Sequence, residues 1–280
     1  MQQYNPVVIP VSFTESKDAP VGSGVSVTHV LPAGGDPGQD TRREDGELAA
    51  NPRTVNVHFA SSNYGPLWMP AVTSWLRAVA FASRYYTVHH GKIGAVGITD
   101  RMYTHAADNQ LVDDFLEDET ATHLFHTECD MLLPDDAITK LVALDKDIAS
   151  GLYFIRNGEG QPCLYQKVVV NRDNPYPHSP VRIFPQDRPF RVDCPGLGCV
   201  VFKRSVFERL PRPWFDLSAN RYGSDMFFFT NAKRAGIETW CDPSVRCGQV
   251  DYTVITYEAY EKRLKDDEWL SKGVILGGLD

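Results

Sequence analysis

The chain has 280 residues and a mass of 31.4 kDa, enough for one large α/β domain and too long for a small disulfide scaffold. Hydrophobic residues make up 42% and charged residues 23%, as in folded globular proteins, so any disorder is expected to be local. The net charge of −8 disfavours nucleic acid as a partner without excluding it.

The chain contains no run that approaches the roughly 20 apolar residues needed to span a bilayer, and it begins with no basic and apolar leader. We therefore expect a soluble, cytoplasmic protein without a membrane span. A viral protein in the cytoplasm of its host would also fit this expectation. The six cysteines lack C-x-x-C spacing and are interpreted as reduced thiols.

Residues 1–53 differ from the rest of the chain because they are rich in glycine and charge and lack apolar periodicity. We interpret them as an N-terminal arm, in which residues 6–13 could pair as an edge strand. An oligomer contact and a cover over an acceptor groove are two roles that stay open for this arm.

From residue 54 onwards, short apolar strands alternate with amphipathic helices. Helices are predicted at 68–82, 106–116 and 137–144. Strands are predicted at 54–60, 85–89, 122–127, 148–155 and 163–170. This alternation predicts a mainly parallel sheet flanked by helices, with ligands at the carboxyl ends of its strands. Residues 251–280 are expected to form a helical extension, with a helix around 257–269.

Two carboxylates, Glu128 and Asp130, follow the buried strand at 122–127, where side chains reach the ligand crevice. A diphosphate-linked ligand carries clustered negative charge, and a divalent cation held by hard oxygen ligands offsets that charge. The cation also stabilises the diphosphate as a leaving group. An isolated acid-x-acid pattern is weak, however, and is more often a pair of solvated loop acids.

The context of this pattern is more specific than the pattern itself. Leu133-Pro134-Asp135-Asp136 and then Asp147–Tyr153, with Gly151, follow it. Together these blocks resemble the GT-A glycosyltransferases, in which a strand ends in an Asp-x-Asp motif that binds a metal and a nucleotide sugar. The resemblance implies a GT-A-like, Rossmann-like domain over residues 54–250 with Mn²⁺ or Mg²⁺ at Asp130, aided by Glu128, which replaces the first Asp.

A second block, Val192–Arg204, resembles the glycine-bearing acceptor-side loop of the same family. Glycine permits close approach to a ligand, although Gly-x-Gly alone favours a simple turn. Trp214 can stack on a sugar or fill the core. The expected residues on the acceptor and sugar side are therefore Gly151, Gly196, Leu197, Gly198, Trp214 and Ser224.

The third block is Tyr222–Phe229, in which Asp225 lies in the first turn of a predicted helix that Gly236 ends. Asp225 is either a helix cap or a functional carboxylate. In the family that the sequence resembles, this place holds a Glu-Asp pair whose Asp is the general base of inverting enzymes; Ser224 replaces the Glu here. An alcohol acceptor is a weak nucleophile, so an inverting transfer needs such a base.

The sequence departs from the family where many relatives have a metal-binding His, because Gln249 stands there. Its amide oxygen can approach a hard cation but brings no charge. The family often has an Arg-Asn pair at the start of the helix before the metal motif. Here Asp108 replaces the Arg, and Asn109 is retained. On the donor side, the resemblance implies contacts from Ala60, Ser61, Ser62, Asn63, Arg101, Asn109 and Cys129.

The expected activity is transfer of a sugar from a nucleoside diphosphate sugar, with a UDP-sugar favoured, to an unknown acceptor hydroxyl. Retention of configuration stays open beside inversion. A sugar nucleotidyltransferase is the first alternative, since it can use a related fold and an acidic metal site. A catalytically silent carbohydrate-binding or interaction protein is the second, and Gln249, Ser224 and Asp108 favour it.

Overall fold

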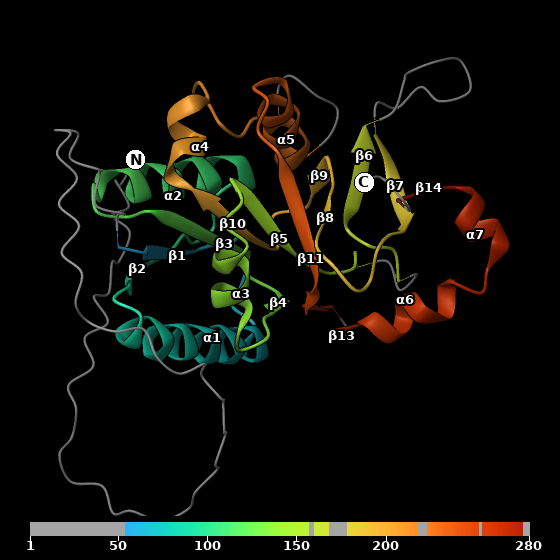
Figure 1. Cartoon of the computed structure of the whole chain (residues 1–280), viewed down its shortest axis with the longest axis horizontal. Helices are drawn as coiled ribbons and strands as arrows, with labels where there is room; N and C mark the ends of the chain where they lie inside the picture. The colour runs from blue at the N-terminus through green and yellow to red at the C-terminus, as the bar shows by residue number, and fades with distance from the viewer. Residues whose placement is uncertain (1–53, 157–159, 168–177, 218–222, 252–253, 277–280) are drawn as a thin grey trace, which may run out of the picture. The chain divides into compact units, whose positions relative to one another are not determined.

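The computed structural model describes residues 54–156, 160–167, 178–217, 223–251 and 254–276 (Figure 1). The predicted arm at 1–53 and its edge strand at 6–13 lie outside these ranges. Within them, the chain has a mixed α/β, Rossmann-like fold, as the alternation of strands and helices predicts.

A seven-stranded sheet forms the centre of the described residues, in the order β2-β1-β3-β10-β5-β11-β8. Five strands run in one direction, and β10 and β8 run against them. The strands in the main direction are β1 (Asn56–Ser62), β2 (Lys92–Ile98), β3 (His123–Glu128), β5 (Ile148–Leu152) and β11 (Thr239–Arg246). The reversed strands are β10 (Cys199–Lys203) and β8 (Phe190–Arg191).

Helices cover both faces of this sheet (Figure 1). Apolar side chains of α1 (Met69–Val88) and α3 (Ala137–Ala143) pack with one face around Phe59 and Phe125. The other face packs around Leu124 and Phe202, against α2 (Thr104–Glu117), α4 (Arg204–Arg209) and α5 (Ser224–Arg234). Successive side chains of a strand point to opposite faces, so neighbours such as Leu124 and Phe125 enter different cores.

The strand predicted at 85–89 is wrong, because helix α1 continues to Val88 and the second strand is β2. Tyr86, in the last turn of α1, is buried in the core, and this tertiary contact favours the helix over the strand preference of its neighbours. The other predicted helices and strands between residues 54 and 152 are confirmed, with ends that shift by a few residues and α1 longer than expected.

Two smaller sheets extend the central one. The first has the order β13-β12-β4, formed by β13 (Val254–Ile255), β12 (Gly248–Val250) and β4 (Met131–Leu132). The second has the order β14-β7-β6-β9, formed by β14 (Val274–Ile275), β7 (His178–Ile183), β6 (Leu164–Lys167) and β9 (Cys194–Pro195).

The C-terminal part holds two short helices, α6 (Tyr257–Arg263) and α7 (Asp267–Ser271), instead of one helix around 257–269. Asp266 separates them by capping α7, because its side chain accepts a hydrogen bond from the Trp269 N–H at 3.0 Å. Tyr260 and Trp269 pack in a third core with Phe154 and Phe184. The helices therefore pack against the domain.

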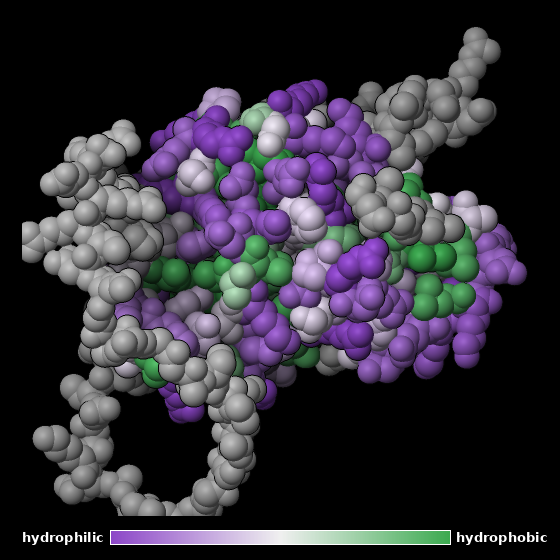
Figure 2. Space-filling model, in the orientation of Figure 1, coloured by the Kyte–Doolittle hydropathy of each residue, from purple (hydrophilic) through white to green (hydrophobic). Residues whose placement is uncertain are grey.

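Hydrophilic residues cover most of the viewed face, with apolar side chains in smaller groups between them (Figure 2). None of the helices in the described residues is long and apolar enough to cross a bilayer. All six cysteines lie in the described ranges and are free thiols.

Candidate active site

The predicted site lies at the edge where the strands of the main direction end. Ser62, the last residue of β1, pairs with Glu128, the last residue of β3. On the other side of β3, Cys199 pairs with Thr127, so the loop before β10 reaches the same edge. The structure thereby brings together two of the motifs that the sequence resemblance singles out.

Asp130 lies in the turn between β3 and β4 and is almost fully buried. Its Oδ2 accepts a hydrogen bond from Gln249 Nε2 at 3.2 Å and forms an ion pair with Arg156 at 3.1 Å. Burial raises the pKa of Asp130 above its ordinary value, although Arg156 and Gln249 oppose this. Arg156 is a partner that the sequence analysis did not identify.

Glu128 is a strongly perturbed carboxyl group of this edge. Burial raises its pKa to about 8, and the charges of Asp130, Asp108 and Asp225 add to the increase, while His126 opposes it. The carboxyl groups of β3 and of α5 thus lie within electrostatic reach of each other. Perturbed carboxyl groups of this kind gather at functional sites.

Asp225 lies in the first turn of α5, which Gly223 caps. Its Oδ1 accepts a hydrogen bond from the Met226 N–H at 2.7 Å. Burial raises the pKa of Asp225, and the charge of Asp108 raises it further. Ser224 beside it is buried. Gly236 ends the helix with a φ of 72°, as predicted, because glycine adopts this angle without strain.

The loop of Gly196, Leu197 and Gly198 is tightly packed. A Cβ on Gly196 would lie 1.8 Å from Tyr153 Oη, so only glycine fits there. The Gly198 N–H donates to Tyr153 Oη at 3.1 Å, and Thr127 Oγ1 donates to the Gly198 carbonyl at 2.7 Å. These contacts fix the loop against the end of β3.

A buried pair, Asp108 and His126, also holds this loop. His126 Nε2 lies 3.0 Å from Asp108 Oδ1, and Nδ1 lies 2.8 Å from the Leu197 carbonyl. The sequence analysis places Asp108 at a donor-side position and finds no role for His126. Their spacing along the chain gives no signal for the pair, because α2 and β3 meet only in the tertiary structure.

The residues at the end of β1 are buried and polar. Ser61, Ser62 and Asn63 are almost completely covered, and Ala60 packs in the core below them. Ser61 Oγ and Asn63 Oδ1 have no hydrogen-bond partner among the described residues. Buried polar atoms are usually paired, so these two atoms lack a partner that such atoms normally have.

Two predicted site residues instead tie elements of the fold together. The Asn109 amide donates to the carbonyls of His105 and Phe215 at 2.7 Å, and its oxygen accepts from the Trp214 N–H at 3.0 Å and the Phe215 N–H at 3.3 Å. Trp214 is buried, and its indole N–H donates to two backbone carbonyls. Their polar groups are satisfied within the fold, and the expected donor and acceptor contacts of these two residues stay predictions.

Three further predicted residues lie near the edge with different surroundings. Arg101 is exposed in the loop after β2, with a φ of 53°. Cys129 is partly buried between Glu128 and Asp130, and burial raises the pKa of its thiol. Gly151 is buried in β5, where a Cβ would lie 2.9 Å from a Val245 methyl group. Gly151 is therefore required for packing between β5 and β11.

A cation site is best tested on the oxygen atoms that have no partner. Asp130 Oδ1 and Gln249 Oε1 are both buried and lack a hydrogen-bond partner among the described residues. They belong to side chains in direct contact, and both are hard ligands. The described ranges hold no cluster of three His, Cys, Asp or Glu side chains with metal-binding geometry. Mn²⁺ or Mg²⁺ would therefore need the amide oxygen of Gln249 as a ligand in addition to the carboxylates of Asp130 and Glu128.

No protein-family model matches this sequence, and no curated protein is similar to it. The fold is similar to that of A197 from STIV, with 18% identity and a TM-score of 0.52 over 73% of this chain and 92% of that one. At this identity the similarity concerns the fold alone.

Two other solved structures match with lower scores. A putative glucose-1-phosphate thymidylyltransferase from Bacillus anthracis has 10% identity and a TM-score of 0.37, over 76% of this chain and 96% of that one. A CMP:2-keto-3-deoxy-manno-octonic acid synthetase complexed with CTP has 17% identity and a TM-score of 0.40, over 77% and 100%.

Proposed function

We propose that this protein is a GT-A-like glycosyltransferase that moves a sugar from a nucleoside diphosphate sugar, with a UDP-sugar favoured, to an acceptor hydroxyl. The observation that carries the proposal is the convergence of carboxyl groups at one sheet edge. Burial raises the pKa of Glu128 to about 8, and the charges of Asp130 and Asp225 contribute to the increase. A site built this way suits a ligand with a bound cation and a reacting hydroxyl.

Mn²⁺ or Mg²⁺ is the cofactor of this proposal, with Asp130, Glu128 and Gln249 as its protein ligands. Support comes from the two unpaired buried oxygens, Asp130 Oδ1 and Gln249 Oε1. When bound, the cation supplies positive charge for the diphosphate group of the donor and of the departing nucleotide. Arg156 holds the other oxygen of Asp130 and orients that carboxylate.

Asp225 is the proposed general base for an inverting transfer. Its Oδ1 is engaged by the Met226 N–H, so Oδ2 accepts the proton of the acceptor hydroxyl. The raised pKa of Asp225 makes it a stronger base than an exposed aspartate. The hydroxyl oxygen then forms the new bond to the anomeric carbon while the bond to the nucleoside diphosphate breaks.

The donor is proposed to lie over the ends of β1 and β2. Ser61 Oγ and Asn63 Oδ1 provide unpaired polar atoms there. The exposed rings of Tyr64 and Tyr103, in the loops after these strands, can stack on a planar base. Ser62, the last residue of β1, pairs with Glu128 of β3. The proposed donor contacts therefore lie beside the proposed cation ligands.

The experiment that tests this function is a panel of nucleotide sugars and nucleoside triphosphates, each with and without Mn²⁺, scored first by thermal shift. Ligand binding to the folded state raises the apparent stability. Product analysis then separates the classes, because glycosyl transfer or hydrolysis releases a nucleoside diphosphate and nucleotidyl transfer releases pyrophosphate. Pyrophosphate release from a triphosphate and a sugar phosphate would replace this proposal by the nucleotidyltransferase.

Two variants assign the roles of the carboxyl groups. Asp225→Asn should keep the metal-dependent thermal shift but lower turnover by about 10²–10⁴, the usual contribution of a general base. Asp130→Asn should abolish the metal-dependent shift itself. Asp135→Asn is the control, because Asp135 is exposed and pairs with Arg77 on the surface. Unchanged turnover in Asp225→Asn would remove Asp225 from the reaction.

A further inference from the structure

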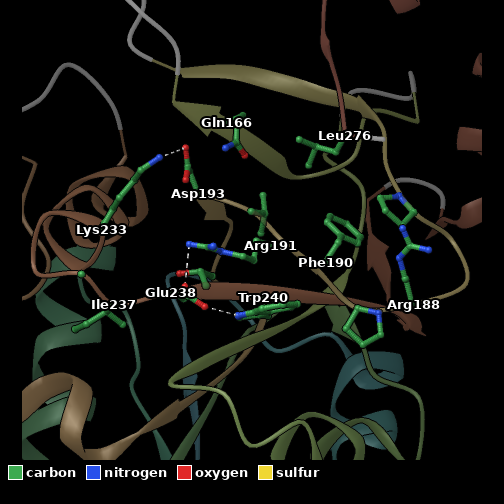
Figure 3. Close-up of a pocket in the computed structure, with 15 residues that line it drawn as sticks. Gln166, Arg188, Phe190, Arg191, Asp193, Lys233, Ile237, Glu238, Trp240 and Leu276 are labelled. Carbon is green, nitrogen blue, oxygen red and sulfur yellow. Dashed lines mark hydrogen bonds and ion pairs between the residues drawn. The ribbon is translucent and has the colours of Figure 1, made fainter. Parts of the chain in front are cut away.

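A cavity of about 920 Å³ lies away from the carboxylate edge, at the start of β11 and beside β8, β6 and the end of α5 (Figure 3). It is lined by a tryptophan, a buried amide and five charged side chains, a combination that no part of the proposed reaction uses. The polar and aromatic residues that the argument needs are Gln166, Arg188, Arg191, Asp193, Lys233, Glu238 and Trp240.

This cavity is separate from the proposed transfer site. Asp225 lies in the first turn of α5 and Lys233 in the last, so the two ends differ by about 12 Å along the helix axis at 1.5 Å per residue. Tyr165 is partly buried and packs against the cores on the two faces of the central sheet. Its neighbour Gln166 lines the cavity, because successive side chains of β6 point to opposite faces.

Two ion pairs shape one wall of the cavity (Figure 3). Arg191 pairs with Glu238 at 2.9 Å, and Lys233 pairs with Asp193 at 2.5 Å. The Trp240 indole N–H donates to Glu238 Oε2 at 3.2 Å, which fixes the ring beside the first pair. Lys146 lies 4.4 Å from the centre of the Trp240 ring and is not part of the cavity lining. The wall thus presents an indole and four oriented charged groups.

Two groups at the cavity are left for a ligand. Gln166 Oε1 is buried and has no hydrogen-bond partner among the described residues, so it needs a donor. Arg188 is exposed, and the described residues offer it no hydrogen bond or ion pair. With Asp193 and Glu238 each paired to a cation, Arg188 leaves the lining with one positive charge in excess.

We propose that this cavity binds an acidic saccharide with one carboxylate. A sugar ring offers an apolar face that packs on the indole of Trp240 and hydroxyl groups that donate to Gln166 Oε1. The carboxylate pairs with Arg188, whose planar guanidinium suits bidentate contact. The single excess charge and the two wall carboxylates disfavour a multiply charged phosphate group. This site does not rest on the proposed transfer function.

The test titrates the full-length protein with methyl β-D-glucuronide and with methyl β-D-glucoside, which has the same ring without the carboxylate, by isothermal calorimetry. We expect a Kd of about 1 mM or tighter for the glucuronide. The glucoside and inorganic phosphate should each bind at least about tenfold more weakly, which corresponds to about 1.4 kcal/mol. The absence of glucuronide binding, or tighter binding of phosphate, would overturn the proposal.

Three variants locate the ligand. Arg188→Ala should weaken glucuronide binding to the level of the glucoside, and Trp240→Ala should weaken the binding of both sugars. Arg234→Ala is the control, since Arg234 is exposed on α5 and does not line the cavity. Arg188 is exposed, so its variant should unfold at the same temperature as the original chain. Unchanged glucuronide affinity in Arg188→Ala would contradict the proposed contact. The three variants should also bind nucleotide sugars as the original chain does, because the cavity and the transfer site are separate.

Discussion

His58 and His126 lie on adjacent strands of the central sheet and are equally buried, yet their surroundings differ. In the register of β1 and β3, His126 pairs with Ala60, two residues beyond His58, so both side chains face α2. Both ring nitrogens of His58 lack a hydrogen-bond partner among the described residues. Both ring nitrogens of His126 are engaged, one by the Leu197 carbonyl and one by Asp108.

The charge of each histidine follows from its partners, since burial is similar. Burial lowers the pKa of His58 to about 4, so this ring is neutral at pH 7. Burial also lowers the pKa of His126, but the hydrogen bond and the charge of Asp108 raise it above its ordinary value. A carbonyl and a carboxylate both accept, so His126 must carry a proton on each nitrogen to satisfy both.

Removing the charge of Asp108 should have the largest effect on the free energy of unfolding. Asp108→Asn removes the carboxylate that compensates the buried charge of His126. We expect the free energy of unfolding to fall by about 3–4 kcal/mol, near the cost of breaking a buried pair, as measured by urea denaturation. Asp113→Asn on the same helix is the control, because its partner Arg212 is exposed. A loss below about 1 kcal/mol in Asp108→Asn would contradict a charged His126.

The pH dependence of stability should reveal the neutral state of His58. Between its ordinary pKa of 6.5 and its folded pKa of about 4, the unfolded chain binds the proton and the folded chain does not. Stability is therefore lost as the pH falls through this window, by up to about 3 kcal/mol from this residue. His58→Leu should show a flatter profile between pH 6.5 and 4 in urea denaturation.

His123 provides the comparison for that measurement, because burial lowers its pKa to about 4 as well. His123→Leu should likewise flatten the pH dependence of stability between pH 6.5 and 4. Unlike His58, His123 has a hydrogen-bond partner, because its Nδ1 lies 2.9 Å from Thr122 Oγ1. An unchanged pH profile in His58→Leu would show that folding does not lower the pKa of His58.

The smallest effect is expected from a neutral contact to the same loop. Thr127→Val removes the hydrogen bond from Oγ1 to the Gly198 carbonyl and keeps the shape of the side chain. A neutral hydrogen bond contributes about 1 kcal/mol, so the free energy of unfolding should fall by about that amount. If the loss exceeded that of Asp108→Asn, Thr127 would be the main anchor of the loop instead of His126.

Much of the fold was predictable from local patterns. The strand at Asn56–Ser62 and the helix at Thr104–Glu117 follow directly from periodicity, and Gly236 follows from the rules for helix ends. Strand β2 was missed because Gly94 and Gly97 dilute its apolar alternation. The composition of residues 85–88 suggests a strand, but the burial of Tyr86 in the core stabilises these residues as the last turn of α1.

The candidate site was predictable in its motifs and not in its contacts. Glu128, Asp130 and Asp225 were found because acids at a strand end and at a helix start are conspicuous in a sequence. The pairing of Asp130 with Arg156, and of Asp108 with His126, joins residues from separate elements. The resemblance implies a ligand contact for Asn109, and three of its four hydrogen bonds to backbone groups form only because α2 and the segment at 214–215 meet.

The reversed direction of β10 has a consequence for how the two sides of this edge are built. The forward strands contribute residues that leave the sheet, whereas β10 contributes the residues that enter it. The connection from β9 to β10 is only Gly196, Leu197 and Gly198, and contacts with Tyr153, Thr127 and His126 hold it in place. A change of length in this short connection would therefore disturb the end of β3 as well as the loop itself.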